Sequence, residues 1–282
     1  MTNFNLKTHL KERAQLVNEE MEKYLPSTYC KMGNLDEVMR YSVFPGGKRF
    51  RPILCLACAE ALGADPHLAL PIACAFEMVH CFSLVHDDLP CMDNDDLRRG
   101  KPTVHKAYGE DTALLAGDAL VIEAFNVAAQ TRVVDHPEIT IEVIKELAQA
   151  SGCLGMVGGQ ILDMEAQHHG TDRQGLLAVH KGKTGALIRG AARSGAIVAG
   201  ASVQQLEAIT EYSEIIGLVF QITDDILDSQ EDPDPISFPT LFGLEESKNI
   251  AKERTERALN LVKPFNSPAL NELANYLLIR TN

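Results

Sequence analysis

Segments of helix-forming composition run through almost the whole sequence, and they limit the possible folds more than any other feature. These segments are rich in Ala, Leu, Ile, Glu and Gln, and no convincing alternation of apolar and polar residues interrupts them. The pattern predicts an all-α protein with helices over seven ranges: Ile53–Leu62, Ala69–Asp88, Thr112–Val134, Ile139–Ala150, Leu176–Ala199, Val203–Leu227 and Leu241–Val262.

Proline and glycine breaks are spread evenly between these ranges, and the sequence shows no linker, repeat or low-complexity segment. Several expected helices are apolar on most faces, which favours a bundle with buried central helices. We therefore expect one large helical domain over residues 1–282.

The charge balance and the cysteine count disfavour some classes of protein. Lys and Arg number 26 against 39 Asp and Glu, and this net charge of −13 disfavours nucleic-acid binding through a general basic surface. Seven scattered cysteines do not resemble a secreted disulfide framework. The first residues lack the apolar core of a signal peptide, and no stretch approaches the ~20 apolar residues of a membrane span. We expect a soluble, cytoplasmic protein.

The range Val203–Leu227 ends in an acidic stripe. Four polar residues follow one another at helical spacing on an otherwise apolar helix: Gln221, Asp224, Asp225 and Asp228. Neighbouring carboxylates repel one another, and the C-terminal end of a helix dipole is unfavourable for anions. A bound cation would relieve both problems.

A second acidic cluster follows the apolar helix expected over Cys74–His86. Asp87 and Asp88 stand at its end, and further aspartates follow Pro90: Asp93, Asp95 and Asp96. Oxygen ligands select hard cations, and Mg2+ is typically held by a few carboxylates and substrate phosphates. Each motif alone is more typical of solvated surface charge. The pair indicates two carboxylate sets that clamp a diphosphate through metal ions.

Basic residues cluster at three places. Gly46–Pro52 contains two glycines and three cations, which suit a second anion, although it is not a Walker A loop. Arg98-Arg99 follows the acidic cluster, and Lys181–Gly185 is expected to open a helix where a phosphate could be received. Taken alone, the first is a solvated basic turn, the second neutralises the aspartates, and the third is a weak signal.

In this order and over nearly the whole chain, these motifs resemble those of the trans-isoprenyl diphosphate synthases, in particular bacterial farnesyl diphosphate synthases (geranyltranstransferases). The matching stretches are GGKRFRP (46–52), HDDLPCMDNDDLRRGKPT (86–103), GGQILDM (158–164), KTGALIR (183–189) and FQITDDILD (220–228). The resemblance implies the isoprenoid synthase fold, a helical bundle around a central active-site cavity, and a homodimer.

The resemblance also implies residue roles. About three Mg2+ ions, replaceable by Mn2+, would be held by Asp87, Asp88, Asp93, Asp224 and Asp228. The allylic diphosphate would contact Arg98 and Lys183. Isopentenyl diphosphate would bind Gly47, Lys48, Arg51, His80 and Arg99. The allylic cation would face Lys183, Thr184 and Gln221, supported by Gln160 and Asp163. The implied catalytic set is Asp87, Asp88, Asp93, Lys183, Thr184, Gln221 and Asp224.

The implied reaction joins isopentenyl diphosphate to dimethylallyl or geranyl diphosphate: the allylic C–O bond ionises, the isopentenyl double bond attacks, and a proton is lost. In the family, the fourth and fifth residues before the first aspartate floor the chain pocket, and here they are Ser83 and Phe82. Phe82, ~7.5 Å deeper along the helix, should stop growth at about fifteen carbons, giving farnesyl diphosphate. Core packing of Phe82, a geranyl or geranylgeranyl product and a non-catalytic partner subunit stay open as alternatives.

The sequence departs from the family pattern just after Asp228. Two lysines that would contact the allylic diphosphate and close a lid are absent from Ser229–Pro239. A true deletion, which would weaken or abolish turnover, and a loop omitted from the numbering both explain this. We favour the second, which predicts a Cα–Cα step far above ~3.8 Å within residues 229–238.

Overall fold

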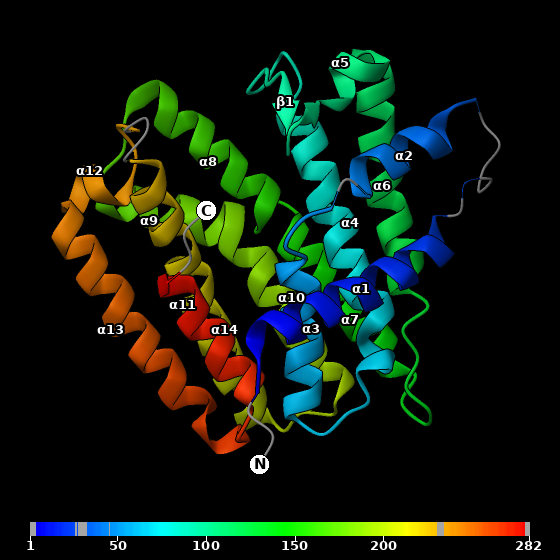
Figure 1. Ribbon diagram of the computed structural model, residues 1–282, viewed down its shortest axis with the longest axis vertical. Coiled ribbons are helices and arrows are strands. Elements are labelled where there is room, and N and C mark those ends of the chain that lie inside the picture. Colours follow the sequence, from blue (N-terminus) through cyan, green and yellow to red (C-terminus); the bar gives the residue numbers. More distant parts are fainter. Residues whose placement is uncertain (1–3, 26, 28–32, 45, 230–233, 280–282) are drawn as a thin grey trace.

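The computed structural model describes residues 4–25, 27, 33–44, 46–229 and 234–279. Their elements, shown in Figure 1, are α1 (Leu6–Tyr24), α2 (Leu35–Val43), α3 (Phe50–Ala61), η1 (Pro66–Ala69), α4 (Leu70–Asp87), β1 (Leu97–Arg98), β2 (Lys101–Pro102), α5 (Val104–Tyr108), α6 (Glu110–Ala128), α7 (Glu138–Ser151), α8 (Met156–His169), α9 (Arg173–His180), η2 (Lys181–Gly185), α10 (Ala186–Val198), α11 (Val203–Asp228), α12 (Phe238–Phe242), α13 (Leu244–Val262), η3 (Lys263–Phe265) and α14 (Pro268–Ile279). The all-α prediction is confirmed, since the strands in these ranges form only one two-residue hairpin.

The expected helices are confirmed where the apolar pattern is long and uninterrupted, in α3, α4, α7 and α11. Two boundaries differ. The helix expected to reach Val134 ends at Ala128, and the one expected from Leu241 begins after Gly243, whose φ of +90° separates α12 from α13. The single helix expected over Leu176–Ala199 is one uninterrupted helix made of α9, the π-helical turn η2 and α10.

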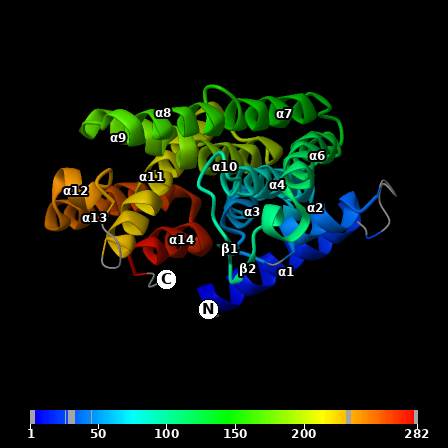
Figure 2. The same ribbon diagram turned by 90° about the horizontal axis from the view of Figure 1, so that it is seen from above.

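Two hydrophobic clusters form the core, one around α4 and one around α11. The first includes Phe76 and Leu120, and the second includes Tyr212 and Phe238. Helices α3 and α10 contribute side chains to both clusters, so they form a shared wall between α4 and α11. Figure 2 shows α3 and α10 between the two helices.

The two acidic motifs lie at the C-terminal ends of the helices that organise these clusters. Helix α4 is buried along most of its length, and Pro90 follows its end. Helix α11 begins with a capping box in which Ser202 and Gln205 bond reciprocally. In Figure 1, β1 after α4 and α12 after α11 both lie at the upper end of the molecule.

One described helical stretch, Pro66–Asp87, is long and apolar enough by composition to cross a membrane. The expectation that no stretch approaches this length was therefore wrong. Some 67% of its apolar window is buried inside the protein, however, and a core helix of a soluble protein passes the same test.

Candidate active site

The first acidic motif lies in a turn that folds back on the end of α4. The backbone N–H of Asp93 donates to the carbonyl of Asp87 at 2.8 Å. The residues between Asp88 and Asp93 therefore form a loop that returns Asp93 to the side of Asp87. Burial raises the pKa of Asp87 to about 6, against the lowering effect of the Lys183 cation and with added repulsion from Asp93.

Asp88 is buried and bound to Arg98 of the β1–β2 hairpin. Arg98 Nε donates to Asp88 Oδ1 at 2.9 Å, and its Nη2 also bonds Asp95 Oδ2 at 2.9 Å. Burial raises the pKa of Asp88, and the Arg98 hydrogen bond opposes the rise. Here the arginine neutralises two aspartates. The metal contact expected of Asp88 and the diphosphate contact expected of Arg98 both stay predictions.

Two basic segments far apart in the sequence meet beside this motif. Arg99 donates to the carbonyl of Gly46 and lies against Gly47, where an added Cβ would come within 2.8 Å of the Arg99 guanidinium. Arg51 is buried, and its Nε has no hydrogen-bond partner among the described residues. Desolvation, with Arg51 and Arg99, holds the pKa of His80 well below its usual range, so this imidazole is neutral. These residues form a basic pocket that is suited to binding an anion.

Arg49, in the same segment, has a structural position. Its guanidinium is 1% exposed and donates to Glu77 of α4 at 2.9 Å, Asn18 of α1 at 3.0 Å and the Val43 carbonyl at 2.6 Å. The expectation that all three cations of the segment face an anion is therefore wrong for Arg49. It holds the segment against α1 and α4, while Lys48 is exposed.

The opposite wall depends on a backbone-to-backbone contact between α8 and η2. A Cβ added at Gly159 would lie 2.0 Å from the backbone nitrogen of Lys183 and 2.4 Å from the carbonyl carbon of Gly182. This close approach lets Lys183 Nζ reach Asp163 at 2.6 Å, with Gln160 half-buried one turn earlier on α8. The expectation that Lys181–Gly185 opens a helix was wrong, because these residues form a π-helical turn inside a longer helix.

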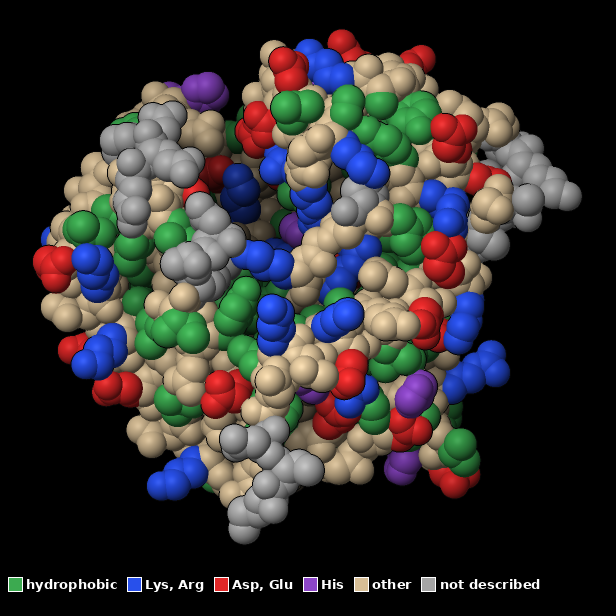
Figure 3. Space-filling view, in the orientation of Figure 1, with side chains coloured by type: hydrophobic (Ala, Val, Ile, Leu, Met, Phe, Trp, Pro, Cys, Tyr) green, Lys and Arg blue, Asp and Glu red, His purple; other side chains and the backbone are tan. Residues whose placement is uncertain are grey.

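The second acidic motif faces the same space. Thr184 Oγ1 donates to Gln221 Oε1 at 2.8 Å, which joins η2 to α11. Burial lowers the pKa of Arg51, and negative charges, Asp224 among them, act against this shift. Arg51 and Asp224 therefore interact electrostatically, as do Asp87 and Lys183. Figure 3 shows this face of the molecule hollowed, with acidic and basic side chains gathered around the hollow.

The described residues contain no ready-made group of three or more metal-ligating side chains. They offer instead Asp87 and Asp93 at one end, and Asp224 and Asp228 on α11. Mg2+ keeps several waters and typically takes one or two carboxylates together with substrate phosphate oxygens. Half-buried Asp87, which Asp93 repels, and half-buried Asp224 therefore fit ions that arrive with a diphosphate.

Phe82 and Ser83 lie one turn and more before the first aspartate. The half-buried Phe82 ring packs edge-on against His86, with ring centroids 5.6 Å apart. His86 in turn lies against Gly117 of α6, where an added Cβ would come within 2.1 Å of its Nε2. Ser83 Oγ donates to the His80 carbonyl at 2.9 Å. Phe82 therefore sits where α4 meets α6, and its side chain also packs against the α4 cluster.

A cavity of about 970 Å³ lies beside the contact between α8 and η2. Its walls come from α8, α9, η2, α10, α11 and α13, and the lining includes Gly158, Gly182, Arg189 and Arg254. None of the aspartates of either motif lines it. Charge and hydrogen bonding, rather than cavity size, therefore locate the candidate active site.

A helical bundle with two acidic motifs and a basic pocket around one cleft defines an enzyme that handles diphosphates. The chain belongs to the polyprenyl synthetase family, whose sequence profile matches residues 32–248. It is a prenyltransferase.

Three known proteins illustrate the similarity. A geranylgeranyl diphosphate synthase from Cyanophora paradoxa is 41% identical, over 100% of this chain and 98% of that protein. The large subunit 1 of the heterodimeric geranylgeranyl pyrophosphate synthase of Arabidopsis thaliana is 39% identical, over 100% of this chain and 81% of that protein. The crystal structure of an FPP/GFPP synthase from Zymomonas mobilis has a TM-score of 0.90 and 38% identity, covering 97% of this chain and 99% of that one.

The relatives carry residues that this sequence lacks. The Arabidopsis alignment extends over 302 positions, whereas this sequence has 282 residues, so the relative carries at least 20 aligned residues without a counterpart here. The overlong Cα–Cα step expected within 229–238 falls on a stretch that includes residues 230–233, outside the described residues.

Sequence reasoning missed the residues that surround Asp225. His180 ends α9 and Phe238 and Phe242 lie in α12, and the three have no shared motif in the sequence. The Phe238 N–H donates to the Asp225 carboxylate at 2.9 Å, and His180 Nε2 lies 3.3 Å from the same carboxylate. The helical stripe placed Asp225 on the correct face of α11 without indicating what it would bind.

Proposed function

We propose that this chain elongates an allylic diphosphate with isopentenyl diphosphate in a Mg2+-dependent reaction. The observation that carries the proposal is the mutual arrangement of charges across one cleft. The Lys183 cation of η2 lowers the pKa of Asp87, and the Asp224 carboxylate of α11 raises the pKa of Arg51. Two carboxylates and two basic side chains therefore face one cleft. Two diphosphates could bind there, each beside a cation.

In this proposal, Asp87 and Asp93 on one side and Asp224 and Asp228 on the other hold Mg2+, which supplies Lewis-acid assistance to the leaving diphosphate. Lys183 binds the same diphosphate. Arg51, Arg99 and neutral His80 hold isopentenyl diphosphate in the basic pocket. The oxygens of Thr184 and Gln221 stabilise the allylic cation, and the apolar walls of α4 and α11 exclude water.

Two products have support from different observations. The curated relatives described above carry the name geranylgeranyl synthase, which favours a twenty-carbon product. Phe82, which lies on α4 against His86, favours the fifteen-carbon farnesyl diphosphate because a large ring there would shorten the chain pocket. We take geranylgeranyl diphosphate as the first candidate and farnesyl diphosphate as the second.

The test is turnover of labelled isopentenyl diphosphate with geranyl diphosphate, with and without Mg2+, followed by product analysis. We expect elongation only with the metal ion, and longer products from Phe82→Ala because the floor is lowered. Glu165→Gln, an exposed change on α8, serves as the control and should behave as the unmodified chain. No metal-dependent elongation by the full chain would overturn the proposal.

A non-catalytic partner subunit is the second candidate function. The observation that favours it is the absence of any lysine or arginine between Asp228 and Lys248. Such a subunit would not elongate alone but would change the product length of a second, active synthase. The assay of the isolated chain separates the two functions.

A further inference from the structure

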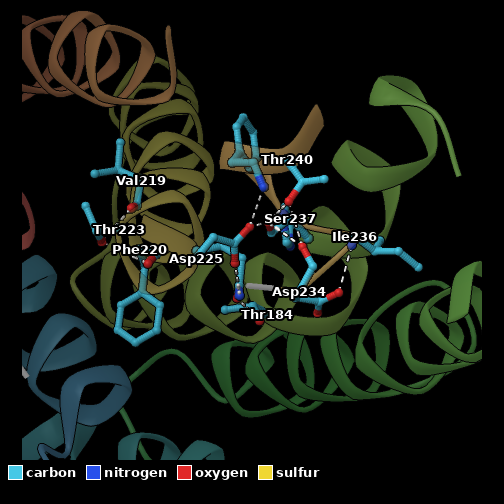
Figure 4. Close-up of polar contacts among 12 residues, drawn as sticks. Thr184, Val219, Phe220, Thr223, Asp225, Asp234, Ile236, Ser237 and Thr240 are labelled. Carbon is cyan, nitrogen blue, oxygen red and sulfur yellow. Dashed lines mark hydrogen bonds and ion pairs between the residues drawn. The ribbon is translucent and has the colours of Figure 1, made fainter. Parts of the chain in front are cut away.

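Asp225, the second aspartate of the α11 motif, has both carboxylate oxygens engaged. Its Oδ2 accepts from the backbone N–H of Phe238 at 2.9 Å and lies 3.3 Å from His180 Nε2. Its Oδ1 accepts from Gln221 Nε2 at 3.2 Å, and Gln221 Oε1 accepts from Thr184 Oγ1 at 2.8 Å. Figure 4 shows Asp225 between α11 and the segment that carries Ser237 and Thr240. One carboxylate therefore joins α9, α11 and this segment.

The segment of residues 234–242, here called the post-motif segment, is fixed by more than Asp225. The Phe238 ring stacks on His180, with centroids 5.5 Å apart, and on Phe242, at 4.6 Å. The Arg173 guanidinium lies 4.5 Å from the Phe242 ring centroid. Ser237 Oγ donates to the Asp234 carbonyl at 2.9 Å. The Phe238 N–H is thus held in place independently, and it fixes one oxygen of Asp225 from outside α11.

We propose that Asp225 is a positioning residue that sets the orientation of the Gln221 side-chain amide. An ionised carboxylate only accepts hydrogen bonds, so it must bind the NH2 end of Gln221. The oxygen end is then turned to Thr184. Without this constraint, the two ends of an amide are nearly interchangeable in shape.

The orientation matters for the function proposed above, on which this inference rests. A developing allylic cation is stabilised by oxygen dipoles and repelled by an NH2 group. With Asp225 in place, Gln221 and Thr184 present oxygen acceptors. A flipped Gln221 would present hydrogen-bond donors instead. Asp225 would therefore act on the chemical step through Gln221, without touching substrate.

Asp225→Asn tests this with little change of shape. If the Asn oxygen keeps the Phe238 N–H, its NH2 group faces the NH2 group of Gln221, and two donors oppose each other. Gln221 should then flip. We expect kcat to fall roughly 10–100-fold, with KM for either substrate changed by less than about threefold. More of the allylic substrate should also leave as the water-quenched alcohol.

A second readout does not depend on activity. In protein labelled with 15N at glutamine, the side-chain NH2 signals of Gln221 are assigned by their loss in Gln221→Glu. They should shift in Asp225→Asn. Ser237→Ala is the matched control, because it removes the hydrogen bonds of Ser237 to Asp234 and Thr240 within the post-motif segment, while the stacked rings still hold Phe238 and the side chains of Asp225 and Gln221 are unchanged. It should leave both the amide signals and kcat unchanged.

The possible outcomes separate clearly. Unchanged Gln221 signals with an unchanged kcat in Asp225→Asn overturn the proposal. So do equal losses of kcat and melting temperature in Asp225→Asn and Ser237→Ala, which would mean that Asp225 only holds the segment. If the unmodified chain shows no metal-dependent turnover, the proposed function fails, whereas the NH2 signals still decide whether Asp225 orients Gln221.

Discussion

At the scale of single residues, the aspartates of the two motifs have distinct environments. Asp87 is half-buried beside Asp93, Asp88 is bound to Arg98, and Asp225 is engaged by Gln221 and Phe238. Asp87 is the one for which burial and a like-charged neighbour raise the pKa to about 6. A carboxylate that is costly to ionise in the free protein is one that a metal ion can stabilise.

The free-energy cost of ionising Asp87 in the folded protein predicts that Asp87→Asn stabilises the metal-free protein. The folded-state pKa of Asp87 is raised from 3.8 to about 6, so the folded protein holds this proton more tightly than the unfolded chain does. The resulting stability is complete below pH ~4 and is lost as the pH rises through about 6. Asn cannot ionise and avoids the loss.

We therefore expect nearly equal unfolding free energies for the two proteins at pH 4 and an advantage of roughly 3 kcal/mol for Asp87→Asn at pH 7.5. Urea unfolding in the presence of a chelator, measured across this range, checks the result. Asp172→Asn would not serve as control, because Asp172 caps α9. Exposed Glu165→Gln on α8 does. An advantage for Asp87→Asn that is independent of pH would contradict the explanation.

At the scale of elements, the contact between α8 and η2 brings Asp163 and Lys183 together. The two backbones touch at Gly159 and Gly182, so a side chain at Gly159 would meet main-chain atoms that cannot rotate away. Lys183 lies in the π-helical turn, whose backbone is the part of the longer helix that meets α8.

Gly159→Ala should therefore separate α8 from η2. We expect a loss of at least about 2 kcal/mol of stability, or a melting temperature lower by roughly 4–8 °C. The Lys183–Asp163 ion pair should weaken, which would raise KM for the allylic diphosphate. Gln167→Ala, exposed on the same helix, should change neither quantity. Thermal unfolding and steady-state kinetics test both, and a neutral Gly159→Ala would show that the contact relaxes at little cost.

The elements also show how much of this protein is readable from its sequence. Helices α4 and α11 were predictable because each is apolar over several turns and ends in aspartates, and the composition of the cleft followed from those motifs. The π-helical turn was not, because it depends on a glycine contact with a distant helix. The short helix α12 and the more polar helices α1 and α8 lack the strong apolar run that identified the others.

Side-chain partners were the least predictable part of the site. Spacing grouped Asp87 with Asp88, yet the fold turns Asp88 to Arg98. Composition grouped Arg49 with Lys48 and Arg51, yet Arg49 is paired with Glu77 inside the protein. Such choices depend on which residues from other elements come near, and a local pattern carries no information about them.

At the scale of the whole molecule, exposed apolar side chains gather on α6, α7 and α8. Leu115 and Ile122 on α6 are 60% and 70% exposed, Ile141 on α7 is 58% exposed, and Val157 on α8 is 47% exposed. Figure 2 shows these three helices along one edge of the molecule. In a chain with a net charge of −13, an apolar edge of this kind favours association with a second copy.

The homodimer implied by the family resemblance therefore predicts a specific sensitivity. Leu115 and Ile122 lie on one face of α6, two turns apart, so a charge at either position would be buried without a partner in a symmetric interface. We expect the unmodified protein to sediment as a dimer at micromolar concentration and Ile122→Glu as a monomer. Val203→Glu replaces an equally exposed apolar residue at the start of α11 and should leave the dimer intact.

Retained helical circular dichroism in Ile122→Glu would show that dissociation does not come from unfolding. A monomeric unmodified chain, or a dimer equally weakened by both variants, would place the apolar edge outside any interface between copies.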